Sequence, residues 1–469
     1  MARSETVKAI AYIVIVATVA VLATMSGLTF KQIVSITTLA IFIGGSLFYW
    51  QFRNAFALVG IALLFFLGVL DIEHFIEFSQ LDVIMFIVGM MIVIGVLEER
   101  GFFDWLIARM LRPVIHRPVA LVVILLLLSF LMAALVDEVT SILFMMTITF
   151  KILEVMGIDP LPFIIFIVFA TNIGSSATVV GNPIGVMIAF NAGFTFMDFI
   201  RWSTIEAIFS VLVVSGIAIL ALNPYIRQMQ EKIDRGEVEV SKLLEVKWRP
   251  ELRGSLALFI GVLAGLIAHH HLEKLLHLPH NSLLLAVPLI GAGIGLFMER
   301  HKAREIVERR VDWWTLLYFL LLFASVGTLK YTGVTDVIAK TIYDISQGDL
   351  VLAMLLVGLV AGFLTAVMDN VLAVATLIPI MYSLAEHMNV FLLWWILLKA
   401  GTYWGNATVI GSTANIVAAG YVEKRLRRGF SMLGWIKIGV PISAITFAMA
   451  FAWLYAQIDM APTWVPPSH

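Results

Sequence analysis

Long hydrophobic runs recur from one end of the sequence to the other, and this feature limits the chain to very few folds. A run of about 18 apolar residues is long enough to cross the hydrocarbon core of a bilayer as an α-helix. Of the 469 residues, 61% are hydrophobic and 13% are charged, whereas about 25% of the residues of a soluble protein are charged. The runs do not alternate apolar and polar residues, as the strands of a membrane β-barrel do. The sequence therefore predicts an all-α polytopic membrane protein.

The hydrophobic runs divide into about 11 single spans and two longer stretches. The single spans are expected at residues 9–28, 33–50, 55–71, 82–98, 162–190, 203–222, 253–269, 283–298, 313–332, 391–420 and 434–456. The longer stretches, 118–157 and 349–388, have room for helical hairpins. Hydrophobicity alone leaves open whether each hairpin crosses the bilayer fully or turns back partway.

Lysine and arginine are concentrated in four of the connections between spans, at 100–117, 227–253, 300–310 and 424–428. Basic connections tend to stay in the cytoplasm, and the order of spans puts all four on one side if each hairpin returns to the side it left. We therefore expect a multi-pass protein of the plasma or inner membrane, with a cytoplasmic N-terminus and an external C-terminus. The first span shares features with a cleaved signal peptide, but its length and the many spans after it favour a retained helix.

The two halves of the sequence repeat each other at offsets of 230 or 232 residues. The matching pairs are Asp82 and Asp312, Gly101 and Gly333, Asp104 and Asp336, Asp137 and Asp369, Thr178 and Thr408, and Gly181 and Gly411. With the orientation above, the span after Asp82 runs inward and the span after Asp312 runs outward, so the halves are inverted copies. Inverted repeats with a binding site near the midplane are typical of secondary transporters.

Small, hydroxyl and amide residues interrupt the repeated spans in the stretches "TNIGSSATVVGNP" and "WGNATVIGSTAN". Glycine and proline weaken a continuous helix, and a break at membrane depth frees backbone groups that need a cavity or a ligand. The residues expected to break the helices are Gly174, Gly181, Pro183, Gly405 and Gly411. Close packing between helices is the alternative role for such small residues, but two aligned clusters favour a binding site.

Acidic residues in the hydrophobic stretches indicate ion handling more specifically. A charge at the bilayer centre costs at least ~2.5 kcal/mol, so it is usually paired, hydrated or functional. Asp137 and Glu138 form a like-charge pair suited to carrying a proton or another cation; the alternative is that they cap a hairpin at the surface. The candidate ligands for substrate and ion are Asp137, Glu138, Thr140, Asn172, Ser175, Ser176, Thr178, Asn182, Asp369, Asn370, Asn406, Thr408, Ser412, Thr413 and Asn415.

Charge and composition argue against several other kinds of partner. The formal net charge is −1, so no overall field points to nucleic acid. The sequence has no cysteine, which excludes disulfides and thiolate metal sites. Histidines cluster at 269–280 without an acidic ligand pattern, so we expect an exposed polar segment there. We expect no metal, no cofactor and no enzymatic activity, and a passive channel would not need titratable acids in each half.

Five motifs carry a resemblance to a known family: "GVLEERGFFDW", "ATNIGSSATVVGNPIGVMIA", "GNATVIGSTANIVAAG" and the hairpin tips "VDEVTS" and "MDNVLA". Through them the sequence resembles the ArsB/NhaD branch of the ion transporter superfamily, with the divalent anion/sodium symporters more distant. The resemblance implies an inverted-repeat fold of eleven spans, two re-entrant hairpins and two broken helices, often homodimeric and working by an elevator-like cycle. It also implies that substrate and ion bind where the hairpin tips meet the helix breaks.

The resemblance suggests a division into five parts. We expect N-terminal scaffold helices at 1–80, a first inverted repeat at 81–222, a cytoplasmic connector at 223–252, further scaffold helices at 253–298, and a second inverted repeat with the last helix at 299–469. The first repeat would hold the re-entrant hairpin 118–157 and the broken helix 162–190. The second would hold the hairpin 349–388 and the broken helix 391–420.

The chain departs from the family pattern at the first tip and the first break. Many members have Asp-Asn at the tip and Gly-Asp-Pro-Pro-Asn at the break, where this chain has Asp137-Glu138 and Gly181-Asn182-Pro183. An acid is thus present at the tip and missing from the break. If tip and break meet, the local charge is kept while its position moves.

These observations predict a secondary active transporter coupled to protons or sodium, with a small inorganic solute or cation and the lipid bilayer as its partners. Among family substrates, proton-coupled export of arsenite or antimonite comes first, because serine, threonine and asparagine can hydrogen-bond a neutral hydroxylated solute. A sodium/proton antiporter is the main alternative, since clustered acids suit cation exchange. A carrier of carboxylates or other oxyanions comes third, because the polar clusters contain no arginine or lysine.

Overall fold

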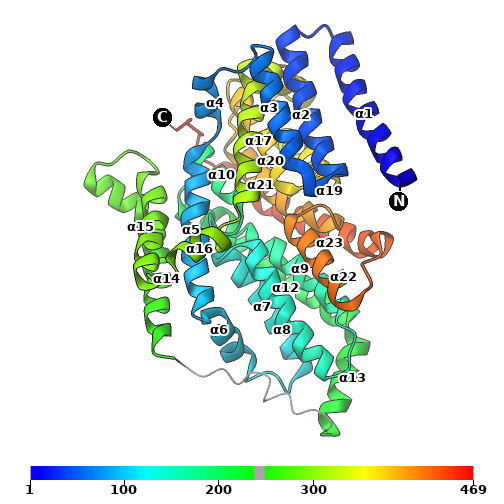
Figure 1. The fold of residues 1–469 in the computed structure, drawn as a ribbon, viewed down its shortest axis with the longest axis vertical. Helices are drawn as coiled ribbons and strands as arrows, with labels where there is room; N and C mark the ends of the chain where they lie inside the picture. The colour runs from blue at the N-terminus through cyan, green and yellow to red at the C-terminus, as the bar shows by residue number, and fades with distance from the viewer. Residues whose placement is uncertain (1, 237–248, 468–469) are drawn as a thin grey trace.

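The computed structural model describes residues 2–236 and 249–467, and over these ranges the chain forms helices and turns but no strand. Nine of the described helices are long and apolar enough to cross a membrane, and several shorter apolar helices accompany them. The predicted all-α polytopic fold is confirmed. Figure 1 shows the long axis of the molecule upright, with the helix labels used below.

The N-terminal helices pack at one end of the molecule. They are α1 (Ala2–Met25), α2 (Phe30–Phe48), the short helix η1 (Trp50–Phe52), α3 (Arg53–Phe66) and α4 (Ile72–Phe78). Helix α2 packs against α1, α3 and α17 (Trp313–Tyr331). Helix α3 ends five residues before its predicted end at 71, where Gly68 turns the chain with φ 66°. Asp71 then caps α4, and the His74 N–H and imidazole hold the pKa of Asp71 below its usual value.

The first repeat runs from α5 to α12. Its elements are α5 (Leu81–Glu99), α6 (Phe102–Leu111), α7 (Pro118–Leu135), α8 (Glu138–Val155), α9 (Leu161–Ser175), α10 (Pro183–Ala192), α11 (Phe196–Phe199), the π-helical turn η2 (Ile200–Thr204) and α12 (Ile205–Ala221). Helices α7 and α8 form the first predicted hairpin and meet at Asp137. Helices α9 and α10 are the two halves of the first predicted broken helix.

The second repeat follows the same order. After α17 come α18 (Val334–Ser346), α19 (Leu350–Val367), α20 (Asn370–Ala385), α21 (Phe391–Tyr403), the 3-10 turn η4 (Trp404–Ala407), α22 (Thr413–Leu426), α23 (Met432–Tyr455) and η5 (Ile458–Met460). Gly101 and Gly333 show the correspondence at the level of the backbone. Each precedes a short helix, α6 or α18, with a left-handed conformation (φ 71° and 78°) that suits glycine.

The segment between the repeats contains more helix than expected. Helix α13 (Asn223–Asp234) occupies the start of the predicted connector, and residues 237–248 lie outside the described residues. Helix α14 (Glu251–Leu276) continues seven residues past the predicted end at 269 and takes His269, which is buried, into the helix. The expected exposure of the histidine segment was therefore wrong for His269, whereas His271, His277 and His280 are exposed. Helices α15 (Ser282–Met298) and α16 (Ala303–Arg310) complete the segment.

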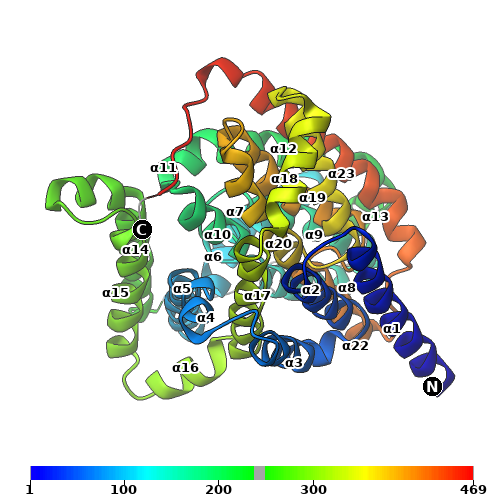
Figure 2. The ribbon, with the colours of Figure 1, turned by 90° about the horizontal axis from the view of Figure 1, so that it is seen from above.

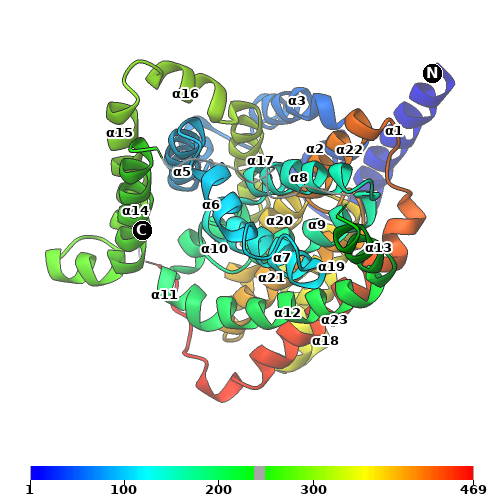
Figure 3. The same ribbon diagram turned by 90° about the horizontal axis from the view of Figure 1, so that it is seen from below.

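The repeats form a central body, and two elements stand at its opposite sides. Helices α14 and α15 lie on one side, where α15 packs on α5, and α1 lies on the other (Figures 2 and 3). Most side chains of α5, α9, α20 and α21 are buried in the centre. These helices are apolar all round, as expected of helices surrounded by other helices.

Candidate functional site

The tips of the two hairpins are helix starts capped by aspartate. Asp137 accepts hydrogen bonds of 2.8 Å from the backbone N–H groups of Val139 and Thr140 at the start of α8. Asp369 accepts one of 3.0 Å from Val371 at the start of α20. Asp369 also accepts a hydrogen bond of 2.6 Å from the Thr413 hydroxyl. The predicted cap role and the predicted ion role are compatible at Asp137, whose two backbone hydrogen bonds both go to Oδ1, whereas both oxygens of Asp369 already accept hydrogen bonds.

The two helix breaks lie where the sequence placed them. The first separates Ser175 from Pro183, and the second spans η4 and residues 408–412. Asn182 caps α10 through a 2.8 Å bond from the Gly185 N–H, and Ser412 caps α22. Position 181 requires glycine because the chain of the first break passes close to Ser175 there. A Cβ atom at Gly181 would lie 2.3 Å from the Ser175 carbonyl oxygen.

Gly174 does not break the helix as predicted. It lies within α9, where a Cβ atom would come 2.2 Å from the carbonyl oxygen of Phe130 on α7. Its role is the close approach of α9 to the hairpin, which is the packing alternative for small residues. Pro183 is the first residue of α10, a position proline tolerates well. Gly405 and Gly411 both lie in the second break and contact each other's backbone.

A threonine in each break holds the end of a hairpin arm. The Thr178 hydroxyl donates to the carbonyl oxygen of Ala134 near the end of α7. The Thr408 hydroxyl donates to the carbonyl oxygen of Ala366 near the end of α19, at 2.7 Å. The same bond therefore occurs in both repeats.

A buried amide network joins the two breaks to each other. Asn172 Nδ2 lies 2.7 Å from Asn406 Oδ1 and 2.8 Å from Asn415 Oδ1, and its own Oδ1 accepts from Ser412 at 3.1 Å. Asn415 Nδ2 donates to the backbone carbonyls of Gly405 and Thr408. These predicted ligands come together, but they largely satisfy one another.

Glu138 lies across from the first break. Its side chain is 2% exposed and faces Ser175 and Asn182, with Asp137 and Asp369 close by. Asn182 Nδ2 itself donates to Ser175 Oγ at 2.9 Å. Glu138 Oε2 has no hydrogen-bond partner among the described residues. The acid at the tip and the amide at the break therefore meet, as the sequence hypothesis requires.

A pocket of about 360 Å³ opens between these elements and α5 and α17. Its polar and charged lining consists of Arg53, Glu98, Asp137, Glu138, Thr140, Asn182, Arg310, Asp312, Thr315 and Thr413. Arg310 is paired with Glu98 at 2.6 Å and Glu99 at 3.0 Å. Beyond that pair, three carboxylates (Asp137, Glu138 and Asp312) line the pocket with the guanidinium of Arg53. We call this cavity the acidic pocket.

Comparison with known proteins places this arrangement in a family. Residues 47–400, which include both hairpin tips, match the family CitMHS, described as citrate transporter. The chain belongs to the CitMHS family. An uncharacterized transporter of Mycobacterium tuberculosis is 30% identical over 390 residues, covering 80% of this chain and 86% of that protein. A second one from the same species is 30% identical over 424 residues, covering 86% and 94%.

Two more distant similarities extend the comparison. The human P protein is 27% identical over 462 residues, which cover 82% of this chain and 54% of the P protein. The crystal structure of the YdaH transporter of Alcanivorax borkumensis superposes with a TM-score of 0.56 over 86% of this chain and 90% of that chain, at 17% identity. This CitMHS protein is thus a membrane transporter by family, and it shares its fold with YdaH.

Sequence reasoning missed Arg53 of this CitMHS protein. Arg53 is 4% exposed and stacks on Trp50, with 3.9 Å between the guanidinium carbon and the ring centroid. Its Nη2 donates to Thr315 at 2.8 Å, and Asp369 and Asp312 are nearby. Arg53 lies more than 80 residues before the first tip, so no local pattern connects it with the acids. A charged residue at the start of an otherwise apolar helix was the available signal.

A second buried cation lies behind the first break. Lys399 Nζ is 2.7 Å from Glu206 Oε2, and the two side chains are 1% and 2% exposed. Lys399 also donates to Ser176 Oγ at 3.2 Å and to the Ser203 carbonyl at 3.0 Å. Ser176, predicted as a substrate ligand, is therefore held by this ion pair. Asn370 lies at the second tip, and its Nδ2 has no hydrogen-bond partner among the described residues.

Proposed function

We propose that this CitMHS protein is a cation-coupled secondary active transporter, with the acidic pocket as the site for a proton or sodium ion. One observation carries the proposal: Glu138 is buried beside Asp137 and Asp369 and keeps an oxygen without a hydrogen-bond partner among the described residues. The two aspartates already receive N–H bonds that stabilise their charge. A proton or Na⁺ at Glu138 would relieve the repulsion among the three acids and supply the missing contact.

The charges favour cation exchange, such as sodium/proton antiport, among the three cargoes considered. Three carboxylates and only the guanidinium of Arg53 beside them make the pocket attractive to cations. A neutral solute such as arsenite or antimonite has less support, because Asn172, Asn406 and Asn415 hydrogen-bond one another. Export of arsenite stays a prediction, as does the narrower ArsB/NhaD branch.

A carboxylate anion is the second candidate, and Arg53 is the observation that favours it. A guanidinium matches a carboxylate with two parallel hydrogen bonds, and Arg53 Nε has no hydrogen-bond partner among the described residues. The starts of α8, α10 and α22 also contribute to this pocket, and helix N-termini attract anions. The family description, citrate transporter, points the same way.

We further propose the plasma or inner membrane as the location, with the N-terminus in the cytoplasm. Ion pairs and hydrogen bonds link the basic segments to one another and to the end of the first hairpin, which supports placing them on one side. Arg100 contacts Glu299 and the Glu251 carbonyl, and Lys232 contacts the Met156 carbonyl at 2.6 Å. We also propose that the protein forms a homodimer and that residues 1–80 and 253–298 form its scaffold. The hairpins and breaks would move against this scaffold in an elevator-like cycle.

The test is flux in reconstituted vesicles under an imposed pH gradient, with sodium, citrate and arsenite offered separately. We expect sodium to move against protons. Glu138→Gln should reduce this flux by at least about tenfold, since the loss of a charged ligand costs more than about 1.4 kcal/mol. Glu154→Gln is the matched control, because Glu154 lies on the same helix at the surface and pairs with Arg425. Wild-type coupled flux of every cargo in Glu138→Gln would refute the coupling site.

A further inference from the structure

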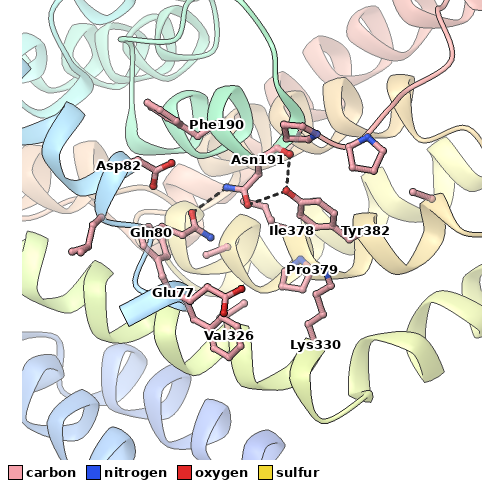
Figure 4. Close-up of a pocket in the computed structure, with 18 of the residues that line it drawn as sticks. Glu77, Gln80, Asp82, Phe190, Asn191, Val326, Lys330, Ile378, Pro379 and Tyr382 are labelled. Carbon is pink, nitrogen blue, oxygen red and sulfur yellow. Dashed lines mark hydrogen bonds between the residues drawn. The ribbon is translucent and has the colours of Figure 1, made fainter. Parts of the chain in front are cut away.

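A second, larger cavity of about 990 Å³ lies next to the acidic pocket, towards the connection at residues 71–82. Helices α5, α10, α17 and α20 line it, together with the 76–82 segment and the C-terminal tail at Trp464 and Pro467. Its charged residues Glu77, Asp82, Lys330 and Glu386 are exposed at the mouth. We call this cavity the outer chamber, because it opens at the predicted external connection 71–82. Figure 4 shows its lining.

Hydrogen bonds hold the polar side chains inside the outer chamber, whose lining is otherwise mostly apolar. Asn191 Nδ2 donates to Gln80 Oε1 at 3.0 Å, and the Tyr382 hydroxyl donates to the Asn191 carbonyl at 2.7 Å (Figure 4). Lys330 Nζ lies 4.3 Å from the centroid of the Tyr382 ring. Three carboxylates and one ammonium group at the mouth give it an acidic balance. A cleft lined mainly by one sign of charge concentrates ions of the opposite sign.

The two cavities are stacked along the same four helices. On each helix, a residue that lines the acidic pocket lies four positions from a residue that lines the outer chamber. The pairs are Phe86 and Asp82 on α5, Val186 and Phe190 on α10, Phe319 and Phe323 on α17, and Val371 and Ala375 on α20. Residues four apart on a helix are neighbours, about 6 Å along its axis. Only about one helical turn therefore separates the cavities.

Apolar side chains fill that turn. We define the aromatic barrier as Phe86, Phe190, Phe319, Phe323, Val186 and Val371, each at most 8% exposed. Phe86 and Phe190 meet edge to face with ring centroids 6.1 Å apart, which joins α5 to α10. Two of the four helices, α10 and α20, belong to the first break and the second hairpin, so the elevator-like movement proposed above would shift these side chains.

We propose that the outer chamber is the external entrance to the acidic pocket for cations, and that the aromatic barrier is the closed gate between them. This inference rests on the proposed function for the identity of the solute, but the two-chamber path itself stands on the geometry. Both cavities reach exposed residues at different connections: the outer chamber at Glu77 and Asp82, and the acidic pocket at Arg310 and Asp312. The structure is therefore closed at the aromatic barrier and open on either side of it.

The natural absence of cysteine makes the path directly testable. Single cysteines are placed in the outer chamber (Val326→Cys, Ile378→Cys), in the acidic pocket (Met90→Cys, Ile94→Cys) and on the outer surface of α12 (Leu212→Cys). Each full-length variant in sealed vesicles is treated in the cold, from one face at a time, with a membrane-impermeant, positively charged methanethiosulfonate. We expect the chamber cysteines to react from one face, the pocket cysteines from the opposite face, and Leu212→Cys from neither.

Two outcomes would overturn the inference. In the first, the chamber cysteines react no faster than Leu212→Cys. In the second, the chamber and pocket cysteines react from the same face. The positively charged reagent should also label the chamber several-fold faster than a negatively charged one of the same size, and equal rates would refute the preference for cations. Labelling requires no transport, so the expected labelling without coupled flux would refute the proposed function alone.

Discussion

At the scale of single residues, Glu138 at the first tip faces Asn182 at the first break. In the pattern implied by the sequence resemblance, asparagine stands at the tip position of Glu138 and aspartate at the break position of Asn182. The sequence raised the hypothesis that the two face each other, and the structure brings them together around Ser175. This contact could be proposed because both residues depart from one family pattern.

Arg53 and Lys399 show where sequence reasoning at this scale ends. Each is a single charge in an apolar helix, and its partner lies far away in the chain: Thr315 for Arg53 and Glu206 for Lys399. Hydrophobic patterns identify such a charge as unusual, but only the packing of helices identifies its partner. The statement that the clusters lack a basic residue was correct for the sequence and incomplete for the folded pocket.

Arg53 allows the two candidate cargoes to be separated. We expect Arg53→Gln to lower carboxylate affinity by at least about 30-fold, because truncating one partner of a buried charge pair costs about 2–5 kcal/mol. Sodium/proton exchange should persist, since the acids remain. Concentration-dependent uptake of citrate and of sodium into vesicles measures both, and Arg53→Lys shows whether charge alone suffices. Equal loss of both fluxes in a folded Arg53→Gln protein would contradict the assignment.

Asn172 should matter more for stability than for ion binding. Asn172→Ala removes three hydrogen bonds. The polar atoms of Asn406, Asn415 and Ser412 that take part in them then lose this partner in a buried position. We expect a loss of at least about 2 kcal/mol, because each stranded polar group costs about 1–3 kcal/mol. Thermal unfolding in detergent measures the loss, with exposed Gln228→Ala as control. Identical unfolding temperatures for the two variants would show that the network does not join the breaks.

At the scale of elements, the helix breaks depend on backbone atoms passing very close together. Gly181→Ala would place a Cβ atom 2.3 Å from the Ser175 carbonyl oxygen, so the break has to shift. We expect a destabilisation of about 1–3 kcal/mol, typical of overpacking, and reduced transport. Gly216→Ala is the control, because nothing lies within 4 Å of its Cβ position on the surface of α12. Unfolding midpoints that agree between the two variants would argue against a rigid break.

The sequence predicted the spans, hairpins and breaks well because long apolar runs and clustered polar residues report them directly. It failed where polarity does not decide the structure. Helix α13 has a polar face and was read as a connector, and α14 carries its histidines past the predicted end. Gly174 was expected to break a helix but lies within one. From sequence alone, a glycine that allows a neighbouring backbone to approach cannot be told from a glycine that ends a helix.

At the scale of the whole molecule, charged contacts tie the second repeat to the first hairpin. Arg425 pairs with Glu154 at 2.7 Å, and Arg428 pairs with Asp159 at 2.5 Å. Exposed pairs of this kind contribute about 0–1 kcal/mol each to the free energy of unfolding. They therefore matter more for the position of α22 than for stability. They put the end of α22 beside the far end of the first hairpin, on the side of the basic connections.

The orientation of the molecule can be tested with reporter fusions. We expect alkaline phosphatase to be active when fused at the C-terminus and inserted at residue 71, because this enzyme folds outside the cytoplasm. A fluorescent protein inserted after Asp234 should be bright, because that segment belongs to the basic side. The opposite pattern at all three sites would invert the molecule, and the outer chamber would then face the cytoplasm.

The aromatic barrier also has an electrical consequence. If water fills both cavities, as the proposed path requires, the potentials of the two bathing solutions reach to within about 6 Å of each other. The membrane voltage then falls mainly across this thin layer instead of across the full hydrocarbon thickness of about 30 Å. A cation crossing between Phe86 and Phe190 would experience nearly the whole of it, worth about 2.3 kcal/mol per charge at 100 mV. Movement of charge past one ring of side chains would make turnover sensitive to voltage, even though the step itself is short.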